Sequence, residues 1–189
     1  APQEALRKEY EVLSNLSKTA NGNLSGSVKL DFETYVQRTY FRQIIQAANR
    51  RLARMTSNEF ILQCREIQDL SSQGQAGLDL DVYDLVIDSV RDVKSLSGGE
   101  SFKAALSLAL GLSDVIQNKK GGIQVDTIFI DEGFGTLDAD SLNKAMQIIN
   151  SLSLEGNKLV GIISHVDELK DQIDQKIEVY KDHAGSKVK

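Results

Sequence analysis

The sequence is poor in cysteine and has no long apolar run. Its one cysteine, Cys64, has no partner for a disulfide within the chain, which fits a reducing cytoplasm. We expect its thiol to be a small buried apolar group and not a reactive site. Because no run of about 18 apolar residues occurs, no segment is expected to cross a membrane. The first residues, Ala1–Glu4, have neither the basic region nor the apolar core of a signal peptide.

Two kinds of ligand site are also missing. The pattern G-x-x-x-x-G-K-S/T occurs nowhere in the sequence. That loop supplies the backbone N–H groups and the lysine that hold the β- and γ-phosphates of a nucleoside triphosphate, so the chain by itself is expected to lack affinity for ATP. No cluster of His and Asp has the spacing of a metal site, which argues against a nuclease.

Charge is distributed unevenly along the 189 residues, whose net charge is −5. Residues 1–57 contain nine Lys/Arg and five Asp/Glu, a net of +4, and the remaining residues have a net of −9. The basic part includes five arginines within one expected helix: Arg38, Arg42, Arg50, Arg51 and Arg54. Clustered cations of this kind can contact nucleic-acid phosphates. They can equally form a solvated helix face or pair with acids on a partner, and the sequence leaves these alternatives open.

Residues 1–27 are expected to form the end of a coiled coil and a linker. The four- and three-residue spacing of a coiled-coil seam is followed by Leu6, Tyr10, Leu13, Ser17 and Ala20. This run breaks in turn-forming residues from position 21 onward. Because an isolated helix of this length is only marginally stable, it is expected to need a partner.

Residues 28–189 are expected to form one α/β lobe. Helices are predicted at about 31–58, 100–117, 140–152 and 167–173. Strands are predicted at about 60–62, 78–82, 85–93, 125–130, 159–163 and 176–180. The early strands are expected to form a small antiparallel region. The later alternation of strands and helices is typical of a parallel sheet that helices cover on both faces.

The segment Leu96–Glu100 precedes the second of these helices. Ser97 and Glu100 have the S-x-x-E spacing of a capping box, which predicts that the helix begins at Ser97. Gly98 and Gly99 are poor helix formers, so their presence in the first turn indicates that something approaches the backbone closely. The free N–H groups of a helix start form an anion site, although a plain capped helix behind a flexible turn has the same pattern.

Two carboxylates, Asp131 and Glu132, end an apolar strand. Ligands of open α/β sheets lie at this end of a strand. Asp131 is expected to hold Mg²⁺ through water, and Glu132 to orient and deprotonate an attacking water molecule. The ordinary alternative is a strand that ends in solvated acids, and the pair by itself is a weak signal.

A glycine-rich loop, Gly133–Asp138, follows these carboxylates, and His165 ends the next strand. A histidine there can hydrogen-bond a γ-phosphate or the attacking water, whereas the ordinary alternative is a surface histidine, as expected for His183. The order of the motifs is more specific than any one of them. A capped glycine turn precedes a helix, the carboxylates follow one strand, and the histidine follows the next, so all three are expected at one edge of a parallel sheet.

These segments resemble the C-terminal ATPase lobe of the SbcC family, the SMC-like subunits of a nuclease complex that processes DNA ends. The resemblance covers nearly all of the chain, including Ala47–Met55, Gly98–Phe102, Leu108–Asp114 and Asp131–Asp138. The sequence departs from the family at Asp88-Ser89, where a glycine turn is expected. The fold that the resemblance implies is the C-terminal lobe of an ABC-type P-loop ATPase head.

The resemblance implies a role for each motif. Leu96–Glu100 would be the ABC signature, Ile128–Glu132 the Walker B motif and Thr136–Asp138 the D-loop. The residues implied to bind ATP are Ser97, Gly98, Gly99, Glu100 and Asp138. Asp131 would be the Mg²⁺ ligand, and the catalytic residues would be Glu132 and the switch histidine His165.

The resemblance also implies partners. The phosphate loop would lie in an N-terminal lobe of the same protein, joined to this lobe by a long antiparallel coiled coil. Two heads would pair as a homodimer around two ATP molecules, and hydrolysis would release them. This cycle would control the access of an SbcD-like nuclease subunit to double-stranded DNA in cytoplasmic DNA repair and recombination.

Two other functions are compatible with these motifs. An SMC-type structural clamp would cycle on ATP without a nuclease, but the match around Phe102 and Gly133–Gly135 favours the nuclease complex. A transporter nucleotide-binding domain normally carries its phosphate loop in the same contiguous chain. The missing loop and the helix expected at residues 5–22 argue against a transporter.

Overall fold

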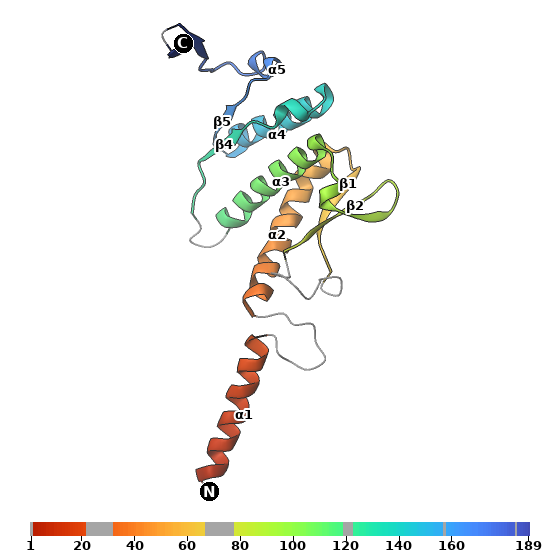
Figure 1. Cartoon of the computed structure of the whole chain (residues 1–189), viewed down its shortest axis with the longest axis vertical. Coiled ribbons are helices and arrows are strands. Elements are labelled where there is room, and N and C mark those ends of the chain that lie inside the picture. Colours follow the sequence, from red (N-terminus) through yellow and green to blue (C-terminus); the bar gives the residue numbers. More distant parts are fainter. Residues whose placement is uncertain (1, 22–31, 67–77, 119–122, 157, 184) are drawn as a thin grey trace.

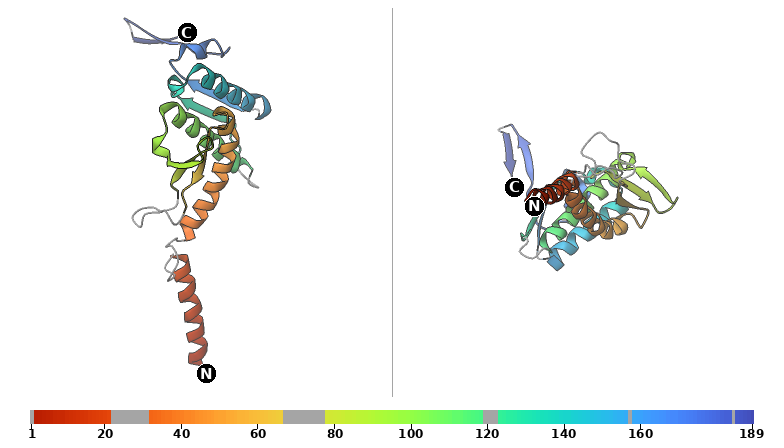
Figure 2. Two further views of the ribbon diagram at one scale, coloured as in Figure 1. Left: turned by 90° about the vertical axis from the view of Figure 1, so that its right-hand side faces the viewer. Right: turned by 90° about the horizontal axis from the view of Figure 1, so that it is seen from below.

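The computed structural model describes residues 2–21, 32–66, 78–118, 123–156, 158–183 and 185–189 (Figure 1). Helix α1 (Pro2–Ala20) extends away from the rest of the chain in both side views (Figures 1 and 2). Leu6, Tyr10 and Leu13 on this helix are exposed. The predicted helix is confirmed, whereas its pairing in a coiled coil stays a prediction. The expected linker lies, apart from Asn21, outside the described residues.

Helix α2 (Phe32–Met55) packs against strand β1 (Phe60–Cys64) of a small antiparallel sheet. The Asn49 side chain joins the two elements. Its Nδ2 donates to the carbonyl oxygen of Leu62 at 2.8 Å, and its Oδ1 accepts the N–H of Leu62 at 2.9 Å. Cys64 at the end of β1 is buried, as predicted, and burial raises the pKa of its thiol.

Strands β2 (Leu80–Asp84) and β3 (Ser89–Asp92) complete this sheet in the order β1-β2-β3. The antiparallel region is therefore confirmed, but the predicted strand through Leu85–Ile87 is wrong. These apolar residues form the turn between β2 and β3, because the carboxylate of Asp84 accepts the N–H groups of the second and third of them. The turn is closed by Asp88, whose φ of 52° takes the place of the expected glycine conformation.

Helix α3 (Gly98–Gln117) crosses α2 at close range. A Cβ atom built on Gly111 would lie 2.7 Å from the carbonyl oxygen of Ile44 and 2.8 Å from the backbone nitrogen of Ala48. Real Cβ atoms do not approach backbone so closely. Glycine at position 111 is therefore what lets the two helices pack with their backbones almost in contact.

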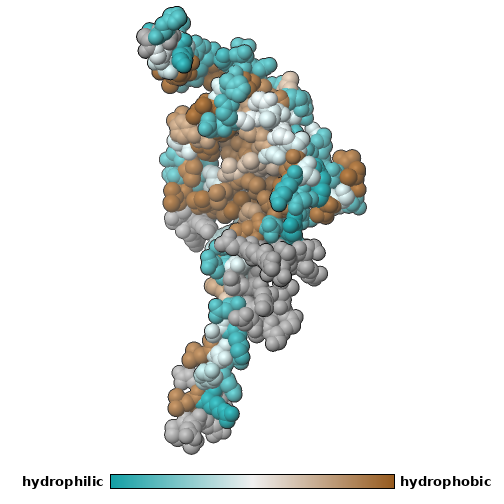
Figure 3. Space-filling view, in the orientation of Figure 1, coloured by the Kyte–Doolittle hydropathy of each residue, from teal (hydrophilic) through white to brown (hydrophobic). Residues whose placement is uncertain are grey.

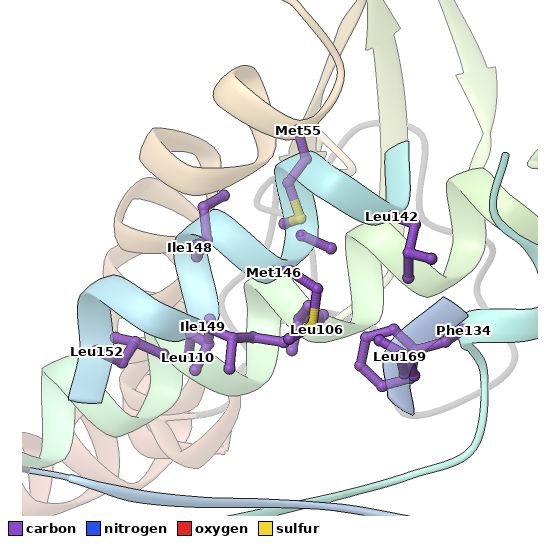
Figure 4. Packing of buried hydrophobic residues seen from close by; sticks show 11 residues of the cluster. Met55, Leu106, Leu110, Phe134, Leu142, Met146, Ile148, Ile149, Leu152 and Leu169 are labelled. Carbon is purple, nitrogen blue, oxygen red and sulfur yellow. The ribbon is translucent and has the colours of Figure 1, made fainter. Parts of the chain in front are cut away.

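The main core lies between α3 and α4 (Ala139–Gly156) (Figure 4). Figure 4 shows Leu106 and Leu110 of α3 beside Met146 and Ile149 of α4. The buried apolar residues of this core are Met55, Leu106, Leu110, Phe134, Leu142, Ala145, Met146, Ile148, Ile149, Leu152 and Leu169. Apolar residues also gather on the surface over the middle of the molecule and at the tip of the β2–β3 hairpin (Figure 3).

Strands β4 (Thr127–Asp131) and β5 (Leu159–Ile163) pair in parallel, with Ile130 opposite Ile162. One face of this pair packs on the main core. The opposite face is exposed, and its apolar residues are Phe129, Leu159 and Ile163. The predicted parallel pairing is confirmed. Within the described residues, however, helices cover only one face of the pair and not both.

The C-terminal part of the chain consists of short elements. Helix α5 (Asp167–Lys170) is shorter than predicted. The last predicted strand, at about 176–180, is displaced toward the C-terminus as β6 (Val179–Asp182). A further strand, β7 (Gly185–Val188), pairs antiparallel with β6 and was not predicted. The described part of the chain contains no helix that is long and apolar enough to cross a membrane.

Candidate nucleotide site

The site begins where α3 begins. The Oγ of Ser97 accepts the N–H of Glu100 at 3.3 Å, and Oε2 of Glu100 accepts the N–H of Ser97 at 2.7 Å. The predicted capping box and helix start are confirmed. Burial by itself would raise the pKa of Glu100, but its bonds to Ser97 and to the guanidinium of Arg91 outweigh burial and hold that pKa below its ordinary value.

The two glycines after Ser97 lie against the loop that follows the carboxylates. A Cβ on Gly99 would lie 2.9 Å from the carbonyl oxygen of Thr136, whereas a Cβ on Gly98 would have ordinary contacts with the Thr136 side chain at 3.5 Å. The close approach that the sequence predicts is therefore present at Gly99, and the approaching group belongs to this chain. The first turn of α3 and the η3 turn (Phe134–Thr136) pack together as one unit.

Asp131 and Glu132 stand at the carboxyl end of β4, and both are exposed. Glu132 has a left-handed backbone with φ of 56°, and its N–H donates to the carbonyl oxygen of Ile163 at 2.9 Å. Gly133 is also left-handed, with φ of 95°, and a Cβ there would lie 2.3 Å from the ring of Phe102. A left-handed conformation at a non-glycine residue costs about 1–3 kcal/mol, and such strain is typical of functional sites.

His165 follows the neighbouring strand β5, and its side chain meets that of Glu132. Nδ1 of His165 lies 2.9 Å from Oε2 of Glu132; the side chain of His165 is 80% exposed and that of Glu132 is 49% exposed. The two residues are therefore brought together at one edge of the parallel pair, as the order of the motifs predicts. With Nδ1–H directed at the carboxylate, Nε2 is the imidazole nitrogen that remains for a ligand.

Asp138 is engaged in capping helix α4. Its carboxylate accepts the N–H of Ser141 at 2.8 Å and the hydroxyl of Ser141 at 3.1 Å. These bonds, with the nearby Lys103, hold the pKa of Asp138 below its ordinary value. The ammonium of Lys103 is buried and donates to the Ser141 hydroxyl at 3.3 Å, so α3 and α4 are joined beside Asp138.

The side chains at the end of β4 can hold Mg²⁺ only if a bound ligand supplies further oxygen atoms. Among the described residues, no group of three or more His, Cys, Asp or Glu could hold a metal ion. Mg²⁺ is commonly bound by one or two carboxylates together with waters and substrate phosphates. An exposed carboxylate such as that of Asp131 fits this mode, in which the nucleotide supplies the other oxygens.

The region that contains these residues is similar to known proteins. Residues 81–151 match the SbcC/RAD50-like Walker B motif family. The SbcC component of the SbcCD nuclease from Vibrio cholerae is 46% identical over 182 residues, covering 96% of this chain and 18% of the relative. The same component from Staphylococcus haemolyticus is 44% identical over 184 residues, covering 95% of this chain and 18% of the relative.

The chain belongs to the SbcC family. It spans about a fifth of the length of these curated relatives and corresponds to their C-terminal part. The residues that match this family model include Asp131 and Glu132, and also the capping box and Thr136–Asp138.

Solved SMC head domains share the fold of this SbcC-family chain. One is an Smc head from Pyrococcus furiosus with an extended coiled coil, bound to the C-terminal domain of ScpA. It superposes with a TM-score of 0.62 at 18% identity, over 99% of this chain and 42% of the other. An SMC ATPase studied for ATP-driven dimerization superposes with a TM-score of 0.61 at 19% identity, over 82% of this chain and 87% of the other. The α/β head fold that the sequence predicts is therefore shown.

The five clustered arginines of α2 do not form one continuous exposed surface in this SbcC-family lobe. Arg38 is buried and donates to the carbonyl oxygen of Arg65. Arg51 makes a two-pronged ion pair with Asp114 of α3 at 2.5 and 3.2 Å. These two arginines hold α2 to its neighbours. The other three, Arg42, Arg50 and Arg54, are exposed. For these three, contact with nucleic-acid phosphates and a solvated or partner-paired helix face both stay predictions.

Two further residues touch the site but were not predicted from the sequence: Arg91, which contacts Glu100, and the buried Lys103. The contact between Arg91 and Glu100 spans the end of a strand, a 3-10 turn and a helix cap. No helical or strand periodicity links two residues across such a boundary. A buried lysine six residues after a helix cap carries no sequence signal either, because lysine is ordinarily a surface residue.

Proposed function

We propose that this chain is the C-terminal lobe of an ATP-hydrolysing head, and that an N-terminal lobe must supply the phosphate loop before hydrolysis can occur. The observation that carries this proposal is the pairing of Glu132 with His165 at the ends of two parallel strands. The capped first turn of α3 lies against the loop that follows Glu132. A chain with hydrolytic side chains and no phosphate loop needs that loop from elsewhere.

In this mechanism the residues at the strand ends act on the nucleotide of their own head. Asp131 would hold Mg²⁺, which neutralises charge that develops on the phosphates. Glu132 accepts a proton from the attacking water as its general base. His165, oriented through Nδ1 by the Glu132 carboxylate, presents Nε2 toward the γ-phosphate or the water.

The signature turn acts on the nucleotide of a second head. The hydroxyl of Ser97 and the backbone N–H groups of Gly98 and Gly99 form an anion site at the start of a 20-residue helix. Glu100 holds this turn in shape. Asp138, whose carboxylate caps α4 in this chain, would line the composite site from the D-loop. Two heads therefore pair around two ATP molecules and separate after hydrolysis.

The exposed face of the β4–β5 pair is the proposed docking surface for the N-terminal lobe. Parallel sheets are normally buried on both faces, yet Phe129 and Leu159 on this face are exposed. An apolar face beside an incomplete nucleotide site suits a lobe that adds both further strands and the phosphate loop. Docking there would place that loop at the edge where Asp131 and Glu132 stand.

At the scale of the cell, we propose that this head controls a nuclease subunit at double-stranded DNA ends in cytoplasmic DNA repair and recombination. This part of the proposal rests on the names of the relatives, which are the SbcC components of the SbcCD nuclease. The same relatives favour a nuclease complex over an SMC clamp that works without one.

The proposal is tested by calorimetric titration with ATP and Mg²⁺. The chain alone should show no binding in the micromolar range, because nothing in it cradles the β- and γ-phosphates. The chain assembled with an N-terminal lobe of the family should bind ATP. Micromolar binding by the chain alone would contradict the split site.

A further inference from the structure

The guanidinium of Arg91 contacts the signature turn on both of its sides. The signature turn is the segment Leu96–Glu100. Nη2 lies 3.0 Å from Oε1 of Glu100, the last residue of this turn. Nη1 lies 3.1 Å from Oγ and 3.4 Å from the carbonyl oxygen of Ser95, immediately before it. Nε is 3.9 Å from the carboxylate of Asp84, and the guanidinium carbon lies 5.8 Å from the ring centre of Phe60. The side chain is thus held on four sides and is about three-quarters buried.

The contact with Glu100 continues directly into the capping box. One carboxylate oxygen of Glu100 binds Arg91, and the other accepts the N–H of Ser97 at 2.7 Å. The hydroxyl of Ser97 is held in turn by the N–H of Glu100. An arginine fork can hold a carboxylate and a neighbouring oxygen in one fixed plane, which a flexible ammonium cannot do.

We infer that Arg91 is a positioning residue for the signature turn, so that the β1–β2–β3 sheet sets the orientation of Ser97 toward the nucleotide of a second head. This inference rests on the proposed function. Arg91 does not touch the nucleotide; it acts through Glu100 and Ser95. A displacement of about 1 Å at a reacting centre can lower a rate about 100-fold, so the fixation of this turn matters to turnover.

Arg65 provides a matched control within the same sheet. Its guanidinium is paired with Asp81 and Asp92 at 2.5 and 2.8 Å, and its side chain is 26% exposed, compared with 27% for Arg91. Removal of either guanidinium deletes ion pairs from the sheet. Only removal of that of Arg91 deletes contacts with the signature turn.

The test uses the head reassembled from this chain and an N-terminal lobe, with Arg91→Met, Arg91→Lys and Arg65→Met. Arg91→Met should lower kcat and weaken ATP-dependent pairing of heads by about tenfold or more, the usual effect of losing a hydrogen bond to a charged group. Its affinity for ATP in the unpaired head should stay within about twofold of the parent, because the signature acts on the other head's nucleotide. Arg91→Lys should be intermediate, since it keeps the charge without the fork.

Arg65→Met should leave kcat and pairing close to those of the parent head. Unchanged pairing and kcat in Arg91→Met, or an equal loss in Arg65→Met, would overturn the inference while leaving the proposed function intact. If the parent head itself neither bound nor hydrolysed ATP, the proposed function would fail, and the role of Arg91 would fail with it.

Discussion

Glu132 is the residue whose backbone matters most to the site. Its φ of 56° turns the chain out of β4 immediately after Asp131, and its carboxylate then reaches Nδ1 of His165. The convergence of the two strand ends could be predicted from the order of the motifs. The left-handed turn could not, because Gly133 signals conformational freedom only at its own position and glutamate rarely adopts this conformation.

Contacts between residues near in sequence were easier to predict than contacts across element boundaries. Ser97 and Glu100 are three positions apart at a helix start, where capping geometry is local and has a known pattern. Arg91 reaches Glu100 across three different backbone conformations, and Lys103 meets Ser141 through tertiary packing. Such contacts depend on how the elements assemble.

Asp138 supports a prediction about acid stability. Its pKa in the folded chain lies below the ordinary value, chiefly because its carboxylate accepts the N–H of Ser141. The charged form therefore stabilises the fold above the unfolded pKa of about 4, and this contribution is lost as the pH falls through the lower folded pKa. Asp138→Asn keeps a capping oxygen but has no charge to titrate.

The melting temperature of the reassembled head, followed from about pH 7 to pH 3, should therefore fall less steeply in Asp138→Asn than in the parent. Asp138→Ala is the control, because it removes the cap itself and should lower the melting temperature throughout the range. If the melting temperature fell equally steeply with pH in the parent and in Asp138→Asn, this carboxylate would not contribute to acid sensitivity.

At the scale of elements, the helices and the parallel strands followed from periodicity and length. The strand predicted through Leu85–Ile87 was wrong, because three consecutive apolar residues are also typical of a strand. The turn forms through hydrogen bonds to the Asp84 side chain, and a hydrophobic pattern does not predict such bonds. Strand β7 was missed because Gly185–Val188 contains one apolar side chain and neither alternation nor an apolar run. It becomes a strand by pairing with β6.

The exposed face of β4–β5 supports a prediction about assembly. Phe129→Glu puts a charge at the centre of the proposed interface, where burying it without a partner is costly. It should weaken association with the N-terminal lobe by about tenfold or more, as measured by titration of one lobe with the other. Val86→Glu is the matched control, because Val86 is 74% exposed and Phe129 is 71% exposed, but Val86 lies at the β2–β3 turn.

Equal loss of affinity in both variants would show that added surface charge, and not this face, is responsible. Unchanged affinity in Phe129→Glu would remove the β4–β5 face from the interface.

At the scale of the whole molecule, we propose that this chain carries one side of a composite site. The described residues place the capped turn at Ser97–Glu100, the carboxylates and the histidine around the ends of two parallel strands, and the family match covers the capped turn and the carboxylates. The chain spans about a fifth of its relatives, so the remaining strands and the phosphate loop are proposed to come from the N-terminal lobe. The proposal of a second lobe came from the sequence motifs and not from the composition.

The most direct test is the steady-state ATP turnover of this chain, of a separate N-terminal lobe and of their mixture. Turnover should appear only in the mixture. Glu132→Gln should lower it by about 10²–10⁴-fold while ATP-dependent pairing of heads persists, because only the general base is lost. No turnover from a stably assembled mixture, or full turnover with Glu132→Gln, would contradict the assignment of this lobe as half of a hydrolytic site.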